Sequence, residues 1–228
     1  MRGEHYELLL RMIDSDGEII LPSAFLPAAE RYNLIPRLDR WVIRTTLRWF
    51  KDNPDKYRKL WMCSINLSGQ SLGDSEFLDE ITGYFKNLSI SPNKFCFEVT
   101  ETSAIANLNN ATRFIKTLTK LGCRFALDDF GSGLSSYAYL KNLPVDFIKI
   151  DGMFVEDLVV NPIHTALVKS INDVGHVMGK KTIAEYVENE AILNQLEEIG
   201  VDYAQGYGIE KPRLMIDCAT EEADRYAN

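Results

Sequence analysis

The sequence predicts an α/β fold in which a parallel sheet closes as a (β/α)8 barrel. Short apolar or β-branched runs, which are typical of strands, alternate with amphipathic stretches whose apolar residues recur at helical spacing. Most of these runs lead into polar residues. That pattern is typical of barrels, because the carboxyl ends of barrel strands carry the active site. An open doubly wound sheet is the alternative, and it would spread the same residues along one edge.

Seven runs are the expected strands, and in chain order they read HYELLLRM, LWMCSINLS, KFCFEVTE, CRFALDD, DFIKID, KTIAEYVE and YAQGYG. The expected helices cover residues 38–50, 75–88, 109–121, 163–178 and 190–199, with a shorter helical segment around YAYLKNLP and a last helix over 216–226. Because a helical stretch follows most strands, we expect consecutive strands to run parallel with helices covering the sheet. Seven strands are one fewer than a closed barrel of eight.

Length and charge limit the possible functions. The chain has 228 residues, 46% of them hydrophobic, and it contains no repeat or linker-like tract, so we expect a single domain over 1–228. Its net charge of -8 argues against binding DNA or an anionic membrane surface, since both are polyanions. A small anionic substrate remains compatible with this charge if metal ions reverse it locally.

Targeting and metal signals are sparse. We find no apolar run long enough to span a membrane and no signal-peptide pattern at the start, and we therefore expect a cytoplasmic location. Three histidines without an H-E-x-x-H motif predict no zinc site. The four cysteines form no C-x-x-C pair and are expected to be reduced thiols. Three of them, Cys63, Cys96 and Cys123, lie in apolar strand-like runs and are expected in the core, and the fourth is Cys218.

Two adjacent acids, Asp128 and Asp129, end the run CRFALDD and precede the turn at Gly131. Neighbouring carboxylates repel each other and are costly to desolvate, so a strand that ends in two of them favours a site for metal ions. The alternative is an ordinary turn or helix cap, for which Asp-Asp before Gly is also suitable.

Polar residues accompany every expected strand. In a closed barrel they would converge on one face and form a single cluster of acids, amides and cations. In chain order they are Glu7 with Arg11, Asn66, Glu98 with Glu101, Asp128 with Asp129, Lys149 with Asp151, Glu185 with Glu188, and Gln205.

These motifs, in this order, resemble the EAL family of cyclic di-GMP phosphodiesterases over nearly the whole chain. The resemblance implies a TIM-like barrel with one antiparallel strand and hydrolysis of one phosphodiester of cyclic di-GMP to give linear pGpG. The matching segments are Glu7-Leu8-Leu9 with Leu10-Arg11, Asn66-Leu67-Ser68, Glu98-Val99-Thr100-Glu101, DDFGSGLSS from Asp128, Lys149-Ile150-Asp151, Ala184-Glu185 with Val187-Glu188, and Gln205-Gly206-Tyr207.

The resemblance also implies two metal ions, Mg²⁺ or Mn²⁺, with Ca²⁺ expected to inhibit. Carboxylate and amide oxygens suit hard cations. The ligands implied for the first ion are Glu7, Asn66, Glu98 and Asp128, and those implied for the second are Asp128, Asp129 and Glu185.

Further roles follow from the same resemblance. Lys149 is implied to hold the attacking water, and Glu185 and Gln205 are implied to have catalytic roles. The alternative for Lys149 is an ordinary surface lysine without a role in the site. Arg11 is implied to bind a substrate phosphate, with a surface ion pair as its alternative, and Glu101 to support the loop after Asp129. The weaker assignments to the substrate site, where supporting salt bridges are equally expected, are Asp151 and Glu188.

The sequence departs from the family pattern at two points. The usual A-E-G-V-E reads Ala184-Glu185-Tyr186-Val187-Glu188, and we expect Tyr186 to reshape the pocket wall without needing the positive φ that a glycine would tolerate. Family members also have a strand ahead of the signature glutamate. This chain therefore reads as a barrel lacking its first, antiparallel strand, truncated at the amino terminus relative to the family.

The sequence leaves more than one function open. The main alternative to an active bacterial second-messenger phosphodiesterase is a non-catalytic cyclic di-GMP receptor, and the oxygen donors retained at all the ligand positions favour the enzyme. A dimerising regulatory module is a third possibility, supported only by analogy. The family resemblance further implies a homodimer and upstream sensory or GGDEF-type domains in a longer parent protein.

Overall fold

The structure, a computed structural model, describes residues 4–88, 90–132 and 137–215. The described chain divides into two compact units. The first contains residues 4–97, 120–123 and 213–215, and the second contains residues 98–119 and 124–212 within those described. The expected single domain over 1–228 stays a prediction, and each unit is described here by itself.

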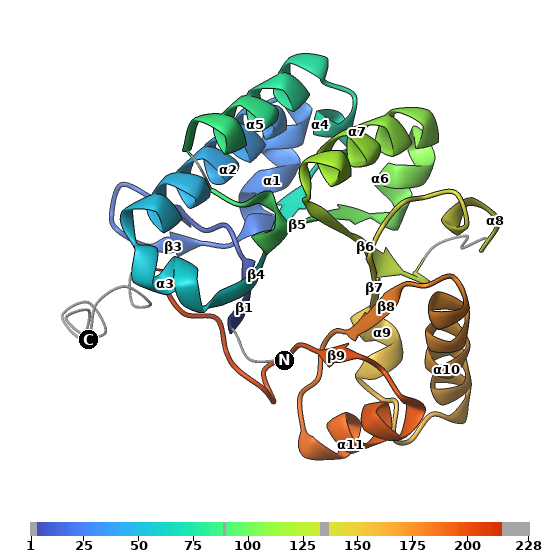
Figure 1. Cartoon of the computed structure of the whole chain (residues 1–228). Helices are drawn as coiled ribbons and strands as arrows, with labels where there is room; N and C mark the ends of the chain where they lie inside the picture. Colours follow the sequence, from blue (N-terminus) through green and yellow to red (C-terminus); the bar gives the residue numbers. More distant parts are fainter. Residues whose placement is uncertain (1–3, 89, 133–136, 216–228) are drawn as a thin grey trace. The chain divides into compact units, whose positions relative to one another are not determined.

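Seven strands form the main sheet, as the sequence predicts (Figure 1). The strand order in this sheet is β1-β4-β5-β6-β7-β8-β9. The pairs β1–β4, β6–β7, β7–β8 and β8–β9 are parallel, which agrees with a TIM-like barrel fold lacking one strand. The strands are β1 (Glu4–Leu8), β4 (Leu60–Leu67), β5 (Phe95–Thr100), β6 (Arg124–Phe130), β7 (Phe147–Ile150), β8 (Lys181–Ala184) and β9 (Tyr203–Ala204).

Helices of the first unit cover β4 and β5. The longest, α2 (Ile35–Asp52), begins beside Pro36 and packs next to α5 (Ser75–Leu88), as Figure 1 shows. Apolar side chains at helical spacing on these two helices are fully buried and form the core: Ile43, Leu47, Phe50, Phe77, Ile81 and Phe85. The other helices are α1 (Pro22–Arg31), α3 (Pro54–Lys59), α4 (Gly69–Leu72) and the 3-10 turn η1 (Pro92–Lys94).

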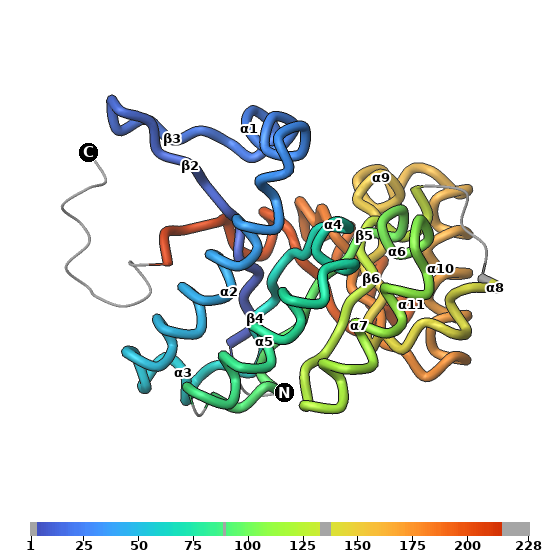
Figure 2. Tube along the Cα trace, turned by 90° about the horizontal axis from the view of Figure 1, so that it is seen from above, coloured from blue at the N-terminus to red at the C-terminus, as the bar shows by residue number. Residues whose placement is uncertain are grey.

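Helices of the second unit follow each strand in turn. In the tube view, α9 (Gly152–Val155) lies beside α10 (Pro162–Val177) (Figure 2). Helix α10 also packs on β7 and β8. Local signals set the ends of these helices, since the Asn161 side chain caps the start of α10 and Gly200 ends α11 (Glu190–Ile199) with a φ of +88°. The remaining helices are α6 (Glu101–Ala106), α7 (Leu108–Leu121) and α8 (Tyr137–Leu140).

Several elements of the first unit were not expected from the sequence, among them a hairpin and three helices, α1, α3 and α4. A hairpin of β2 (Met12–Ile13) and β3 (Ile19–Ile20) follows β1, so the first expected strand ends at Leu8. Helix α1 carries Pro27 inside it, and because proline usually interrupts helices, the pattern there does not predict one.

Other expectations concern the cysteines, the carboxyl terminus and membrane spans. Three cysteines of the described residues are buried and form no disulfide, as expected: Cys63, Cys96 and Cys123. The helix expected over 216–226 and Cys218 lie outside the described residues. None of the helices in the described part of the chain is both long and apolar enough to cross a bilayer.

Candidate active site

Adjacent side chains of a strand normally point to opposite faces, but Asp128 and Asp129 converge. The register between β6 and β7 shifts between Leu127 and Phe130, and Asp129 takes a left-handed φ of +52°. This bulge inserts one residue into β6 and redirects the side chains around it. As a result, Asp128 and Asp129 each bring a carboxylate oxygen to within 4.8 Å of the other and of an oxygen of Glu185, which follows β8.

Lys149 lies in the middle of this group of carboxylates. Its side chain is only 1% exposed, and it projects from β7, the strand between β6 and β8. The Nζ atom lies 2.7 Å from Glu98 Oε2, 3.0 Å from Asp128 Oδ1 and 2.8 Å from Glu185 Oε1. A buried ammonium needs such partners because an unpaired charge is costly to desolvate. The lysine therefore gathers acids from three strand ends at one point.

The oxygen donors around Lys149 fit a divalent metal ion. Asp128 Oδ1 is buried and makes no hydrogen bond to any described residue, although the lysine ammonium lies nearby. Asp128, Asp129 and Glu185 together supply three oxygens within 4.8 Å of one another. Hard oxygen donors of this kind are the ligands that Mg²⁺ and Mn²⁺ prefer. This geometry supports the three residues expected at the second ion.

The Glu101 carboxylate connects two segments of the loop after Asp129. Its Oε2 accepts a hydrogen bond of 3.1 Å from the Gly131 N–H, and its Oε1 accepts one from the Tyr139 hydroxyl on α8. Burial, together with this carboxylate, raises the pKa of Tyr139, so the phenol stays a donor at neutral pH. The sequence analysis assigned a loop role to Glu101 and missed Tyr139, because no local pattern pairs residues 38 positions apart.

In the first unit, two expected metal ligands touch each other. Glu7 on β1 and Asn66 near the end of β4 lie on paired strands, and Asn66 Nδ2 donates a hydrogen bond of 2.9 Å to Glu7 Oε1. The turn after Asn66 is held by Asp39 of α2, whose Oδ2 accepts hydrogen bonds from the Ser68 N–H at 3.0 Å and the Ser71 hydroxyl at 2.6 Å. Burial raises the pKa of Asp39. The sequence analysis did not identify Asp39.

The remaining predicted residues of the second unit lie on turns that follow strands. Asp151 caps the short helix α9, since its side chain accepts a hydrogen bond of 2.9 Å from the Met153 N–H. Glu188 is exposed. Gln205 follows β9, where its backbone N–H donates to the Ala184 carbonyl and its carbonyl accepts from Val187. These hydrogen bonds fix the Asp151 side chain and the Gln205 backbone.

The expectation for Tyr186 was wrong. This residue has a φ of +60°, in the left-handed region that glycine tolerates and that a side chain with a Cβ rarely adopts. The family glycine therefore matches the backbone conformation that this turn adopts, and the tyrosine is held there in spite of the strain. Glu185 and Val187, its neighbours, are tied by backbone hydrogen bonds to Ile150 and Gln205, which fixes the turn.

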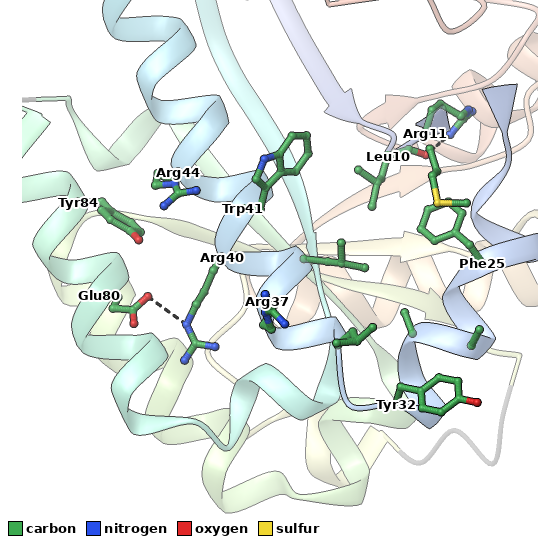
Figure 3. Close-up of a pocket in the computed structure, with 15 residues that line it drawn as sticks. Leu10, Arg11, Phe25, Tyr32, Arg37, Arg40, Trp41, Arg44, Glu80 and Tyr84 are labelled. Atoms are coloured by element: carbon green, nitrogen blue, oxygen red, sulfur yellow. Dashed lines mark hydrogen bonds and ion pairs between the residues drawn. The ribbon is translucent and has the colours of Figure 1, made fainter. Parts of the chain in front are cut away.

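Arg11 lines a cavity of the first unit, shown in Figure 3. The cavity has a volume of about 1010 Å³ and a mixed lining of aromatic and basic side chains, including Phe25, Trp41 and Arg44. One guanidinium nitrogen of Arg11 donates to the Leu10 carbonyl at 2.8 Å. A cavity of this size, lined by planar rings and guanidinium groups, suits an anionic ligand with an aromatic portion.

This geometry defines a class of protein: α/β proteins with a parallel sheet that carry oxygen donors and a buried lysine at the ends of their strands. Comparison with known families agrees, since residues 2–212 match the EAL domain family. The chain belongs to the EAL domain family.

Two curated bacterial relatives illustrate the similarity. The chain is 46% identical to "Cyclic di-GMP phosphodiesterase PdeB" of Shewanella oneidensis, over 99% of this chain and 26% of the relative. It is 40% identical to "Cyclic di-GMP phosphodiesterase PdeF" of Escherichia coli, over 97% of this chain and 30% of that protein. The chain thus spans between a quarter and a third of the length of these two relatives.

Solved structures show the same fold. The crystal structure of the FimX EAL domain from Pseudomonas aeruginosa bound to c-di-GMP superposes with a TM-score of 0.86 at 31% identity, covering 93% of this chain and 85% of that one. The PaMucR phosphodiesterase in complex with c-di-GMP gives a TM-score of 0.87 at 30% identity, covering 96% and 87%.

Proposed function

We propose that this chain is a phosphodiesterase that hydrolyses one phosphodiester of cyclic di-GMP and releases linear pGpG. The observation that carries the proposal is the group of carboxylates around Lys149 in a member of the EAL family. Relatives named as cyclic di-GMP phosphodiesterases at 46% and 40% identity support the choice of substrate and reaction.

The residues present fit Mg²⁺ or Mn²⁺ as cofactors. Glu7, Asn66, Glu98 and Asp128 would hold one ion, and Asp128, Asp129 and Glu185 would hold the other. Such ions supply activation of water and neutralisation of charge that develops on the phosphoryl oxygens. Ca²⁺ would bind the same oxygens but inhibit, because its longer and more variable coordination relaxes the geometry around the reacting atoms.

The chain's own groups would position the reactants. Lys149, held by three carboxylates, would donate hydrogen bonds to the attacking water and offset the negative charge that collects in the site. Glu185 keeps the ammonium of Lys149 oriented through the 2.8 Å contact. Gln205, fixed by its backbone at the end of β9, would support the metal ligands from beside them.

Three residues are proposed to bind substrate. Arg11 would contact a phosphate, for which the planar guanidinium fork is suited. Asp151 and Glu188 follow β7 and β8, the strands that carry or precede Lys149 and Glu185, and their carboxylates would suit the hydrogen-bond donors of guanine.

The wider setting is proposed by analogy. MucR of P. aeruginosa, 31% identical, is named a "Bifunctional diguanylate cyclase/cyclic di-GMP phosphodiesterase", and we propose a GGDEF-type or sensory domain in the parent of this chain as well. A homodimer and a cytoplasmic location belong to the same proposal.

Product analysis tests the function directly. The purified chain is incubated with cyclic di-GMP and Mg²⁺ or Mn²⁺, and the nucleotides are separated by chromatography, with the Glu185→Gln variant as the inactive control. We expect pGpG from the wild type and unchanged substrate from the variant. Tight binding of cyclic di-GMP without any turnover would identify a receptor instead, and a chain that neither binds nor cleaves it contradicts both functions.

A further inference from the structure

Tyr186 has a strained backbone conformation and an exposed aromatic side chain. Its φ of +60° places a bulky aromatic residue in the left-handed region, where nearly every residue other than glycine is strained. It nevertheless remains 58% exposed, so little apolar area is buried in return. A strained conformation that stability does not explain points to a function at that residue.

The Tyr186 ring packs against Gly152. A Cβ atom placed on Gly152 would lie 2.8 Å from the Tyr186 Cβ and 3.0 Å from the ring atoms Cγ and Cδ2. Only glycine therefore allows the ring to approach the turn after Asp151 so closely. This contact orients the ring from one side, and the exposed remainder of the side chain faces solvent.

The backbone on the other side of Tyr186 is also fixed. Val187 donates a hydrogen bond of 3.0 Å to the Gln205 carbonyl and accepts one of 2.8 Å from the Gly208 N–H. Gly206 lies so close to this segment that a Cβ there would come within 2.3 Å of the Val187 backbone. The tyrosine is therefore carried by a segment that two neighbouring turns hold in place.

The position of this ring relates it to the chemistry. Glu185, the preceding residue, contacts the Lys149 ammonium at 2.8 Å and belongs to the group of possible metal ligands. Asp151, whose turn carries Gly152, comes two residues after Lys149. Tyr186 therefore directly follows one acid of the Lys149 cluster, and its ring packs against the residue that follows Asp151.

We propose that Tyr186 forms a stacking subsite for a purine base, which in the proposed reaction is one guanine of cyclic di-GMP. The inference rests on the proposed function and adds a residue to its substrate site. Every base presents a π-face, and an aromatic ring held in advance loses little freedom when a base stacks on it. Since Tyr186 is not one of the acids that gather around Lys149 or could hold a metal ion, we expect its ring to set substrate affinity and to leave the chemical step unchanged.

Three variants separate stacking from backbone strain. Tyr186→Phe keeps the ring, Tyr186→Asn keeps a side chain that tolerates positive φ, and Tyr186→Gly restores the family residue. For Gly and Asn we expect KM to rise about tenfold, the equivalent of about 1.4 kcal/mol of stacking, with kcat within about twofold of the wild type and a melting temperature that is no lower. For Phe we expect KM to be unchanged.

A measurement of cyclic di-GMP binding without turnover tests the stacking subsite independently of the proposed hydrolysis. The dissociation constant for cyclic di-GMP is measured with Ca²⁺ in place of Mg²⁺, and it should follow the same order as KM. Equal constants in the wild type and all three variants would overturn the stacking subsite while an active wild type keeps its function. A wild type that neither binds nor cleaves cyclic di-GMP overturns the proposed function and, with it, this inference.

Discussion

The second unit contains two buried lysines with opposite surroundings. Lys149 lies near the carboxyl end of β7, and its ammonium contacts three carboxylates. Lys180 lies just before the amino end of β8, and its ammonium donates hydrogen bonds of 2.9 Å to the neutral carbonyls of Leu143 and Val145. Both side chains come from neighbouring strands of one sheet, yet only one of them faces a group of acids.

The difference shows how to tell a structural charge from a functional one. Burial lowers the pKa of Lys180, with Asp146 opposing this shift, and the carbonyl partners satisfy the ammonium without leaving a surplus of charge. Around Lys149, three carboxylates lie within 3.0 Å of one ammonium, so these four groups together carry negative charge. Such an excess is costly to bury and favours further cations, whereas the Lys180 site is complete as it stands.

Metal removal is the strongest test of this comparison. With Mg²⁺ or Mn²⁺ chelated, we expect hydrolysis of cyclic di-GMP to be lost entirely and to return when either ion is restored, because the excess carboxylates require cations. Ca²⁺ should not restore it. Full turnover in metal-free buffer would show that the Lys149 cluster does not depend on metal.

The matched variants Lys149→Met and Lys180→Met come next. Replacing Lys149 removes the group that we propose positions the attacking water, and we expect kcat to fall by about 10²–10⁴. The same change at Lys180 should leave kcat within about twofold, because its partners are backbone carbonyls at the opposite end of the strands. Steady-state kinetics on both proteins decides, and similar losses in the two variants would remove the distinction between the lysines.

The loop support by Glu101 predicts a smaller loss. Glu101→Ala leaves the Gly131 N–H and the Tyr139 hydroxyl without their shared acceptor, and the strand end carrying Asp129 should loosen. We expect about a tenfold lower kcat and a higher Mn²⁺ concentration for half-maximal rate. Tyr139→Phe, which keeps the Gly131 contact, should lie between this variant and the wild type. An unchanged metal requirement in Glu101→Ala would contradict the loop-supporting role.

Replacing Lys180 should lower the stability of the fold and leave the reaction rate unchanged. Lys180→Met leaves two buried carbonyls with fewer donors, and we expect a loss of about 1–3 kcal/mol in the free energy of unfolding. Because the pKa of Lys180 is lowered in the folded state from its usual 10.5, the unfolded chain binds more protons between the two pKa values. Stability of the wild type should therefore rise with pH as it approaches 10.5, and the variant should lack this rise. Urea unfolding at pH 7 and pH 10 measures both effects.

The smallest predicted effect concerns Asp202. Burial alone would raise its pKa, but hydrogen bonds from the Thr182 N–H at 2.9 Å and from His176 hold the pKa of Asp202 below the usual 3.8. This contribution to stability is present above about pH 4 and is lost as the pH falls through the folded-state pKa. Its size should be about 0.5 kcal/mol, since the side chain is partly exposed. Asp202→Asn should flatten the acid limb of the unfolding curve by that amount.

Patterns local to the sequence account for much of the fold and for the identity of the site residues. Strands at β4, β5, β6 and β7 follow from short apolar runs, and α2, α5, α7, α10 and α11 follow from helical spacing, since periodic burial leaves a periodic sequence. The adjacent acids at Asp128 and Asp129 and the lysine at 149 were identifiable because charged residues at the end of an apolar strand are unusual. Helix α1, with Pro27 inside it, carried no comparable signal.

The conformation of individual residues could not be read in the same way. Nothing in the letters AEYVE states that Tyr186 has a positive φ, because that angle results from hydrogen bonds to Ile150 and Gln205, which are distant in the chain. Tyr139 and Asp39 were missed for the same reason, since each acts through a partner about 30 or more residues away.

The sequence by itself determined the α/β class, the order of the strands and the set of oxygen donors and cations available for chemistry, because these depend on residue type and spacing along the chain. Only the tertiary structure decided which of them meet. The bulge in β6 brought two adjacent carboxylates together, and the pairing of β6, β7 and β8 placed Lys149 among acids while Lys180 faced carbonyls. Electrostatic interactions depend on distances of a few ångströms in space, and these distances are set by strand register and packing across the sheet.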